Sequence, residues 1–509
     1  MNTVRRTILS VLLALPAARL HAATTNRVGA GSVLEVIVHY QTFDPVRPWQ
    51  KKRPGVRSGY GVVVDRGKVL TTEDLVRNHT LVELRSAKSG AKIPADVEQL
   101  DWQGNLALLV PAPGSSAAAT TPAPLAPTPK KDEAVRIVQF DGTGDIQEGA
   151  ATVVRMAVEG LPSAASSMLT LSVLTDLSVN GRGAAVFAGD ALAGLVMTYD
   201  SSRRMAKVLP APIISRFLRD VQDAPYRGFA TAGFVWTSLV DPTKRAYLNV
   251  PGRERGVMVV STVPRTGAAE TLKARDVVVE WAGHAVDNQG FYEDAELGRM
   301  QFVHLIKGLS FPGDIVPARV YRDGQVHDVN VRLMRAVDED RLIPENIAGR
   351  RPEYLVEGGL VIRELTGDYL REYGGRWRLQ LPRLAHIYST RARQPEESGD
   401  RVVILSHVLP DPVNIGYQQF GRRVIEQING TPVRCMADVF RVVDRDGGLA
   451  RLQLAGLGVE LALDPALLPR ANRRLAERYG IAALRFQIKG GLKTRPSTAH
   501  RSAPASSGR

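Results

Sequence analysis

Cysteine is almost absent from this chain, because Cys435 is the single one among 509 residues. An intrachain disulfide is therefore impossible, and no zinc site can rest on cysteine ligands. We expect no metal ion and no cofactor. Cys435 follows a strand-like run, where a lone thiol usually acts as a small hydrophobic side chain.

Long hydrophobic runs are also scarce. After residue 22 no segment has eighteen apolar residues in a row, so we expect no stable membrane span. The early apolar run at residues 8–15 follows Arg5 and Arg6 and leads to small residues near Ala22. This order is typical of a secretory signal peptide, which we place at residues 1–22. We therefore predict an exported protein, and a bacterial periplasm fits.

Acidic residues are outnumbered: Lys and Arg total 66 against 52 Asp and Glu, which gives a net charge of +14 at pH 7. The basic residues are scattered and form no block, so they indicate a basic surface and no nucleic-acid partner. With 44% hydrophobic residues the chain can form sizeable cores, and its length suits three or four domains.

The chain is rich in short β-branched runs separated by glycine turns. Between residues 58 and 111, such runs occupy positions 62–64, 69–72, 80–84 and 105–110. Strands this short, at this spacing, favour a β-barrel. The predicted fold class is mainly β.

The order of these runs resembles the first barrel of trypsin-like serine proteases of the HtrA/DegP (Deg) group. In that group a Leu-Thr-x-x word precedes the catalytic histidine, whereas here residues 70–73 (LTTE) precede Asp74. The group's catalytic aspartate opens a Leu-Ala-Leu-Leu strand, and Asn105 stands at that position here. The resemblance implies a retained scaffold and a lost catalytic pair.

The second barrel of the group carries the nucleophile loop Gly-Asn-Ser-Gly-Gly-Pro. Its counterpart is residues 180–185 (NGRGAA), so Arg182 replaces the serine. Asn180 replaces the glycine whose N–H helps to form the oxyanion hole. An unperturbed aspartate, with a pKa of about 4, is a poor base at Asp74, and a guanidinium cannot act as a nucleophile. No catalytic residue is therefore predicted.

Two further expectations concern this cleft. Asp74 and Arg182 occupy positions that would touch in an active relative, so we expect them to form a bidentate ion pair. The alternative is that both side chains are solvated without contact. His79 and Ser178 are the nearest substitutes for a base and a nucleophile, and both are expected to be structural.

Further sequence motifs narrow the resemblance to the Deg proteases of plant organelles and nuclei and their bacterial relatives. They lie at residues 43–54, 227–236 and 403–417, and the resemblance spans about residues 36–487. Residues 111–133 are rich in Pro, Ala, Ser and Thr and are predicted to form a surface loop between the barrels.

A PDZ-type word, Leu-Lys-x-Gly-Asp-Val-Ile, occurs within residues 272–286, with Arg275 at the usual glycine. A similar strand–turn–strand recurs at residues 424–433, where Asn429 and Gly430 suit a type I′ turn. We therefore predict a trypsin-like double β-barrel followed by two PDZ-type α+β domains. The predicted boundaries are 27–222 for the protease-like domain, 223–340 and 341–487 for the two PDZ-type domains, and 488–509 for a disordered tail.

PDZ domains bind an extended peptide as an added strand, with a loop that captures its terminal carboxylate. The resemblance assigns that loop in the first PDZ domain to Tyr247, Leu248, Asn249 and Val250, and asparagine can adopt the left-handed conformation of the family's glycine. The strand within residues 358–362 is the candidate groove strand of the second domain. Trimers or hexamers are what the resemblance implies.

Three functions remain open from the sequence. The favoured one is a catalytically inactive pseudoprotease that binds peptides or unfolded proteins as a chaperone-like or regulatory scaffold. The alternative is an active serine-type endopeptidase in protein quality control. The third is a purely structural assembly protein.

Overall fold

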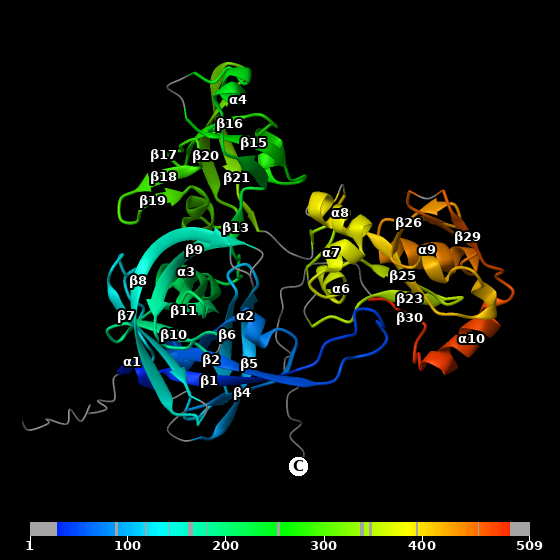
Figure 1. Cartoon of the computed structure of the whole chain (residues 1–509), viewed down its shortest axis with the longest axis horizontal. Helices are drawn as coiled ribbons and strands as arrows, with labels where there is room; N and C mark the ends of the chain where they lie inside the picture. The colour runs from blue at the N-terminus through cyan, green and yellow to red at the C-terminus, as the bar shows by residue number, and fades with distance from the viewer. Residues whose placement is uncertain are drawn as a thin grey trace, which may run out of the picture.

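The computed structural model describes residues 28–488 apart from short gaps at 87–89, 118–119, 142, 161–165, 181, 252–254, 336–339, 346–348, 393–394, 396 and 457. The predicted signal peptide and nearly all of the predicted tail lie outside the described residues. Two barrels stand together, one further domain lies above them in the view of Figure 1, and another lies beside them. Within the described part of the chain, no helix has the length and apolar character needed to cross a membrane.

Six antiparallel strands close the first barrel in the order β1-β2-β3-β6-β5-β4. Its interior is almost entirely aliphatic, with Val36, Val38, Val63 and Leu84 fully buried. Its elements are α1 (Val28–Gly31), β1 (Val33–Tyr40), β2 (Gly55–Val63), η1 (Asp65–Gly67), β3 (Val69–Thr71), α2 (Glu73–Val76), β4 (His79–Arg85), β5 (Lys92–Asp101) and β6 (Leu106–Pro111).

The second barrel closes in the order β10-β11-β12-β9-β8-β7. The helix α3 follows its last strand and buries Ile213, Ile214 and Phe217, the apolar face expected from the sequence. The elements are β7 (Ala134–Phe140), β8 (Ile146–Gly160), β9 (Ser167–Thr175), β10 (Ala185–Ala188), β11 (Ala191–Asp200), β12 (Met205–Pro210) and α3 (Ala211–Gln222). The predicted mainly β, double-barrel fold is confirmed.

The segment between the barrels differs in part from the prediction of a surface loop. Ala123 and Ala126 are buried, and their N–H groups donate to the carbonyls of Val63 and Leu192. The segment therefore pairs with both barrels and is held between them. Much of the segment is an exposed loop, as predicted; its buried alanines were not foreseen, because composition does not reveal that small side chains fit a tight inter-barrel space.

The domain predicted as the first PDZ-type domain is built on a six-stranded sheet in the order β14-β15-β16-β20-β21, with β17 paired to β16. Its core is continuous with that of the second barrel, since Phe229, Trp281 and Phe302 belong to the same cluster as Phe187 and Phe217. The elements are β13 (Ala230–Thr231), β14 (Phe234–Thr237), α4 (Pro242–Tyr247), β15 (Val257–Thr262), α5 (Gly267–Thr271), β16 (Val277–Trp281), β17 (His284–Ala285), β18 (Phe291–Asp294), β19 (Gly298–Gln301), η2 (Leu305–Leu309), β20 (Ile315–Arg322), β21 (Gln325–Arg332) and β22 (Met334–Arg335).

The second PDZ-type domain has an eight-stranded sheet in the order β29-β28-β26-β25-β24-β23-β30, with β27 paired to β26. Asn429 and Gly430 both have positive φ, 50° and 76°, as the predicted turn requires. The elements are β23 (Tyr354–Glu357), β24 (Leu360–Glu364), α6 (Gly367–Arg371), α7 (Trp377–Gln380), α8 (Pro382–Arg391), β25 (Val403–Val408), η4 (Pro412–Asn414), η5 (Gln418–Phe420), β26 (Arg423–Ile428), β27 (Thr431–Pro432), α9 (Met436–Asp446), β28 (Arg451–Leu454), β29 (Glu460–Ala462), α10 (Leu468–Tyr479) and β30 (Arg485–Phe486).

The second PDZ-type domain has clusters of its own and meets the barrels through an arm, residues 41–54 between β1 and β2. The arm reaches from the first barrel toward this domain in Figure 1. Trp49 packs on Tyr354 and His407, with ring centroids 6.3 Å apart in both pairs. Lys52 forms an ion pair with Glu372 at 2.7 Å. The basic, tryptophan-containing insert noted in the sequence is thus an interdomain tether.

Candidate functional site

Asp74 lies on α2, the single helical turn that follows β3. Its backbone N–H donates to Oδ1 of Asn105 at 2.8 Å. Asn105 is fully buried and has a left-handed backbone with φ 51°, which asparagine tolerates better than most residues. Its amide also points Nδ2 toward the sulfur of Met197 at 3.5 Å. Asn105 therefore fixes the backbone of the turn that carries Asp74.

Arg182 is joined to the first barrel through its backbone. Its carbonyl accepts a hydrogen bond from the N–H of Tyr60 at 2.8 Å. A Cβ at Gly59 would lie 2.6 Å from that carbonyl, and a Cβ at Gly183 would lie 2.5 Å from the carbonyl of Tyr60. The two glycines thus let β2 and the loop that carries Arg182 meet at backbone distance.

The side chains of Asp74 and Arg182 form an ion pair, with Nε of Arg182 2.9 Å from Oδ2 of Asp74. The predicted contact is therefore present. The predicted bidentate geometry is wrong, because Oδ1 of Asp74 is buried without a hydrogen-bond partner among the described residues. The guanidinium approaches the carboxylate through Nε. The backbone of Arg182 is held by β2, which limits how its side chain can turn toward Asp74.

A second guanidinium stands behind this pair. Arg57 donates through Nε to the carbonyl of Leu75 at 2.6 Å and lies over the ring of Tyr40. Burial lowers the pKa of Arg57, and the positive charge of Arg182 lowers it further. Two guanidinium groups and one carboxylate thus lie at the positions where the sequence comparison would place an imidazole and a hydroxyl.

Asn180 also has its groups engaged. Its N–H donates to Oε1 of Gln139 at 3.1 Å, and its Nδ2 donates to the carbonyl of Phe140 at 3.0 Å. The hydroxyl of Tyr60 contacts its side-chain oxygen, and burial raises the pKa of that hydroxyl. The N–H that would point at an oxyanion is thus directed to a neighbouring side chain.

The two possible substitutes lie elsewhere, as expected from the sequence. Nδ1 of His79 lies 3.0 Å from the carbonyl of Val76, within its own turn. Ser178 accepts a hydrogen bond through its carbonyl from Gln139 at 3.0 Å. Neither residue has a recorded contact with Asp74 or Arg182.

A serine–histidine hydrogen bond that the sequence analysis missed occurs in the second PDZ-type domain. Oγ of Ser406 lies 3.1 Å from Nδ1 of His407 and 3.0 Å from the carbonyl of Val361. Ser406 is fully buried, so no substrate can reach its hydroxyl. Adjacent residues on one strand gave no signal for this pair, which packing alone brings about.

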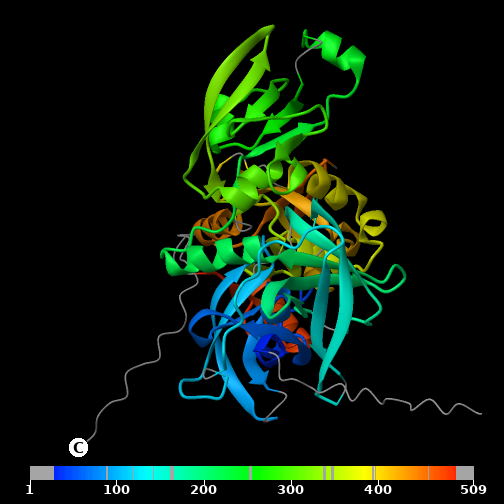
Figure 2. The same cartoon turned by 90° about the vertical axis from the view of Figure 1, so that its left-hand side faces the viewer.

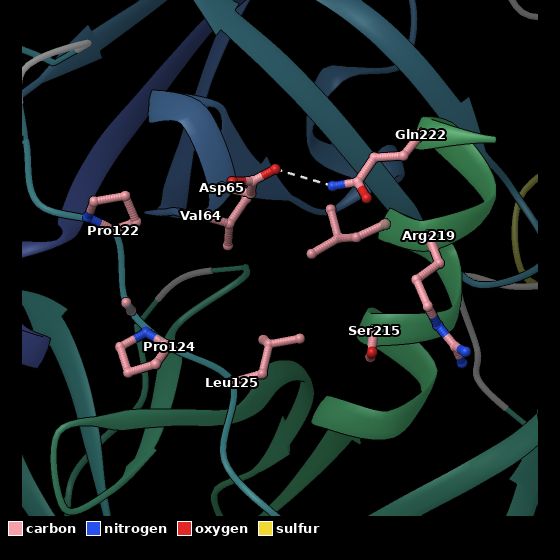
Figure 3. A pocket seen from close by; sticks show the side chains of 10 residues that line it. Val64, Asp65, Pro122, Pro124, Leu125, Ser215, Arg219 and Gln222 are labelled. Atoms are coloured by element: carbon pink, nitrogen blue, oxygen red, sulfur yellow. Dashed lines mark hydrogen bonds between the residues drawn. The ribbon is translucent and has the colours of Figure 1, made fainter. Parts of the chain in front are cut away.

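The structure also places a pocket of about 450 Å³ between the barrels, away from the triad positions. Figure 3 shows the turn at Asp65 on one side, the inter-barrel segment with Pro122 and Pro124 on another, and α3 on the third. Gln222 donates to Oδ2 of Asp65 at 2.9 Å across this space. Its lining is mostly apolar and holds no base–nucleophile pair. Among the described residues, no three His, Cys, Asp or Glu side chains are grouped as metal ligands.

The loop predicted to capture a peptide carboxylate, residues 247–250, has the expected backbone conformation, but it does not lie beside an unpaired strand edge. Asn249 has φ 53°, as the glycine replacement requires. Leu248 and Val250 pack with Val277 and Tyr321 on one face of the sheet, and Tyr247 is 68% exposed at the end of α4. The strand after this loop, β15, is paired with β14 and β16. A peptide cannot be added beside it, so carboxylate capture by these four residues stays a prediction.

One outer strand of this sheet is β14, with β21 at the opposite side, and the sequence analysis did not single it out. Gly233, with φ 77°, turns the chain into this strand, and its carbonyl accepts from the N–H of Val263 at 2.7 Å. Because antiparallel residues alternate in direction, the N–H and C=O of Phe234 face the open edge. The glycine before an aromatic strand was the available signal.

The groove strand predicted for the second PDZ-type domain is not at an edge. Within the sheet, β24 pairs with β23 on one side and with β25 on the other. Leu360, Val361 and Ile362 are fully buried. The prediction was wrong because the alternation of a strand does not tell whether both of its edges will be paired.

The architecture defines the class first: a trypsin-like double barrel followed by a PDZ-type module. A family model described as a PDZ domain matches residues 343–486, which confirms the PDZ nature of the second module. At the level of whole chains, the protein resembles the HtrA/Deg-type proteases that carry PDZ domains, and its relatives include plant Deg proteins.

The relatives support this over most of the chain. Protease Do-like 2, chloroplastic, of Arabidopsis thaliana is 27% identical over 420 residues, which cover 81% of this chain and 68% of the relative. Protease Do-like 4, mitochondrial, of the same plant is 23% identical over 420 residues, covering 81% and 76%. The solved structure of HtrA-type protease AlgW with a decapeptide aligns with 61% of this chain and 98% of its own, at 13% identity and a TM-score of 0.48.

Proposed function

We propose that this chain is a catalytically inactive HtrA/Deg-like protein that holds peptides or unfolded segments and does not cleave them. The ion pair between Arg182 and Asp74, 2.9 Å apart, carries the proposal. It occupies the two positions where a nucleophile and its base would have to exchange a proton. A permanently protonated guanidinium cannot give up that proton.

The size of the deficit supports inactivity. In a protease with the same triad, loss of the serine or the histidine alone lowers turnover by on the order of 10⁶-fold. Here the third position, Asn105, is also neutral, and the N–H of Asn180 is bonded to Gln139. Both the proton relay and part of the oxyanion stabilisation are thereby absent from the arrangement.

Peptide binding is proposed at the open edge of the first PDZ-type sheet. An extended chain would pair with β14 through the outward N–H and C=O of Phe234, as strand addition requires. Val235 is 44% exposed on this strand and offers apolar contact beside it. The bound client is proposed to be an extended or unfolded polypeptide, because backbone pairing needs no defined side-chain sequence.

The proposal is tested by incubating the purified chain with casein beside Arg182→Ala as the matched control. Equal hydrolysis, at the buffer rate, is expected for both. A variant combining Asp74→His, Asn105→Asp, Arg182→Ser and Asn180→Gly should gain hydrolysis, because it restores the base, its orienting carboxylate, the nucleophile and the loop glycine. Hydrolysis by the unaltered chain that a covalent serine-directed fluorophosphonate inhibitor abolishes would establish the alternative, an active serine-type endopeptidase.

Two further properties belong to the proposal. Export to a periplasm is supported by the basic and apolar order of residues 1–22, and N-terminal sequencing of the secreted protein should find cleavage near Ala22.

Assembly into a trimer or hexamer is proposed from the resemblance. Light scattering of the purified chain should then give three or six times the mass of 55.4 kDa minus the signal peptide.

A further inference from the structure

The last helix of the second PDZ-type domain carries a row of arginines on its exposed side. On α10, Leu468, Ala471 and Leu475 are buried at helical spacing, while Arg470, Arg473, Arg474 and Arg478 are exposed. The four arginines fall at i, i+3, i+4 and i+8, which places them away from the buried face. Glu477 is the single acidic residue of the helix. The exposed side is therefore strongly positive.

Two of these arginines hold the helix to the neighbouring loop. Arg474 forms an ion pair with Asp411 at 2.7 Å, and Arg478 donates to the carbonyl of Pro410 at 3.3 Å. Arg470 and Arg473 have no ion-pair partner among the residues that the structure describes. The charges of Arg470 and Arg473 are therefore available to an anionic partner.

Exposed aliphatic side chains border the same surface. Leu467, which precedes the helix, is 50% exposed, and Ile415, at the tip of the loop that Arg474 holds, is 78% exposed. Val413 of that loop and Leu468 of the helix both approach Gly358, which places the loop beside the start of α10. In Figure 1, α10 lies at the outer side of its domain, away from the barrels.

We propose that this face, made of α10 and the loop at 411–415, binds a surface of anionic lipid. Guanidinium groups would pair with the phosphate headgroups, and Leu467 and Ile415 would enter the boundary between headgroups and acyl chains. The arginines alone could bind any polyanion. The two exposed aliphatic side chains favour a partner with an apolar layer, which a lipid membrane has and a fully polar polyanion lacks. The basic face, with little acidic charge, is complementary to a negative membrane surface.

The test is co-sedimentation of the full chain with vesicles of phosphatidylglycerol and phosphatidylcholine, compared with vesicles of phosphatidylcholine alone, at about 0.15 M salt. Binding to the anionic vesicles only is expected. The double variant Arg470→Gln/Arg473→Gln should bind about 25-fold more weakly, at about fivefold per arginine. Among the residues that the structure describes, these two side chains form no ion pair or hydrogen bond, so stability should not change.

The matched control is Arg203→Gln/Arg204→Gln, which removes the same charge from the turn after β11. It should retain full binding. Ile415→Ser should also weaken binding, while leaving the fold intact. Equal binding to neutral vesicles, equal loss in both double variants, or no effect of Ile415→Ser would each overturn the lipid assignment. So would displacement of the chain from the vesicles by poly-glutamate at equal charge concentration, because that would make the partner an acidic polypeptide.

Discussion

The two PDZ-type sheets differ in how many neighbours pair with corresponding strands, β14 in the first and β24 in the second. In the first, β14 ends the sheet and leaves one edge unpaired. In the second, β24 lies between β23 and β25 and is buried on both faces. The first domain can therefore accept an added strand, whereas the second has filled that place with its own chain.

The two domains also differ in how they join the barrels. The first shares its core with the second barrel and is fixed by buried charge, since Arg216 donates to the carbonyls of Gly228 and Ser310. The second keeps separate clusters and depends on the arm around Trp49. Domains that share a core are expected to unfold together. A domain held through a short arm can lose its contact with the barrels after one substitution in that arm. The views in Figures 1 and 2 agree that the first domain is stacked on the barrels.

The largest effect should appear in hydrogen exchange. The amide of Phe234, at the open edge, is expected to exchange about a thousandfold faster than the amides of Leu360–Glu364, which only open with their whole domain. Mass spectrometry on the intact chain measures both. Adding a peptide that binds should slow exchange in β14 and leave β24 unchanged. Slow exchange of Phe234 in the free chain would mean that this edge is already covered.

The second prediction concerns pH at the arm. Burial, and then the charge of Arg363, lowers the pKa of His407 to about 4 from its usual 6.5. The groups that face it are Arg363, Asp44 and Arg47. Because the folded pKa is depressed, the stabilisation is present above pH 6.5 and is lost as the pH falls toward 4. The free energy of unfolding lost by pH 4 is about 3 kcal/mol.

Urea unfolding of the chain at pH 7 and at pH 4 measures this loss. The His407→Gln variant has no imidazole to protonate, so its loss over the same interval should be smaller by about that amount. Identical pH dependence in the two proteins would show that His407 is not held neutral at the arm.

The third prediction removes the anchor itself. Trp49→Ala should destabilise the junction by about 2 kcal/mol, less than a fully buried tryptophan because Trp49 is only partly buried. The second PDZ-type domain should then unfold in a transition separate from the barrels. Lys52→Ala, which removes an exposed ion pair on the same arm, should cost less than about 1 kcal/mol. Equal effects of the two changes would argue against the aromatic contact as the tether.

The smallest effect is expected at the closed cleft. Arg182 is 51% exposed, so its pair with Asp74 is screened by solvent and should contribute less than about 1 kcal/mol. A double-mutant cycle with Asp74→Asn and Arg182→Gln measures the coupling. A coupling above about 2 kcal/mol would mean that the ion pair stabilises the contact between the two barrels.

Much of the site could be predicted from residue types alone. Aspartate, asparagine and arginine at positions 74, 105 and 182 determine which protons can move, whatever their exact geometry. The contact between Asp74 and Arg182 also followed, because the scaffold brings those positions together. Its geometry through Nε did not, because the backbone bond between Tyr60 and Arg182 fixes where the guanidinium starts.

The features that could be read from the residues alone are local: the double-barrel strands, the left-handed Asn249, the turn at Asn429 and Gly430, and the residue types at positions 74, 105 and 182. The folded chain was needed to show which strand edges are open, that residues 122–126 contact both barrels, and that the arm contacts the second PDZ-type domain. Turn geometry and proton chemistry belong to one or a few residues, so a sequence states them directly. An edge is open or paired only through what the rest of the chain places beside it.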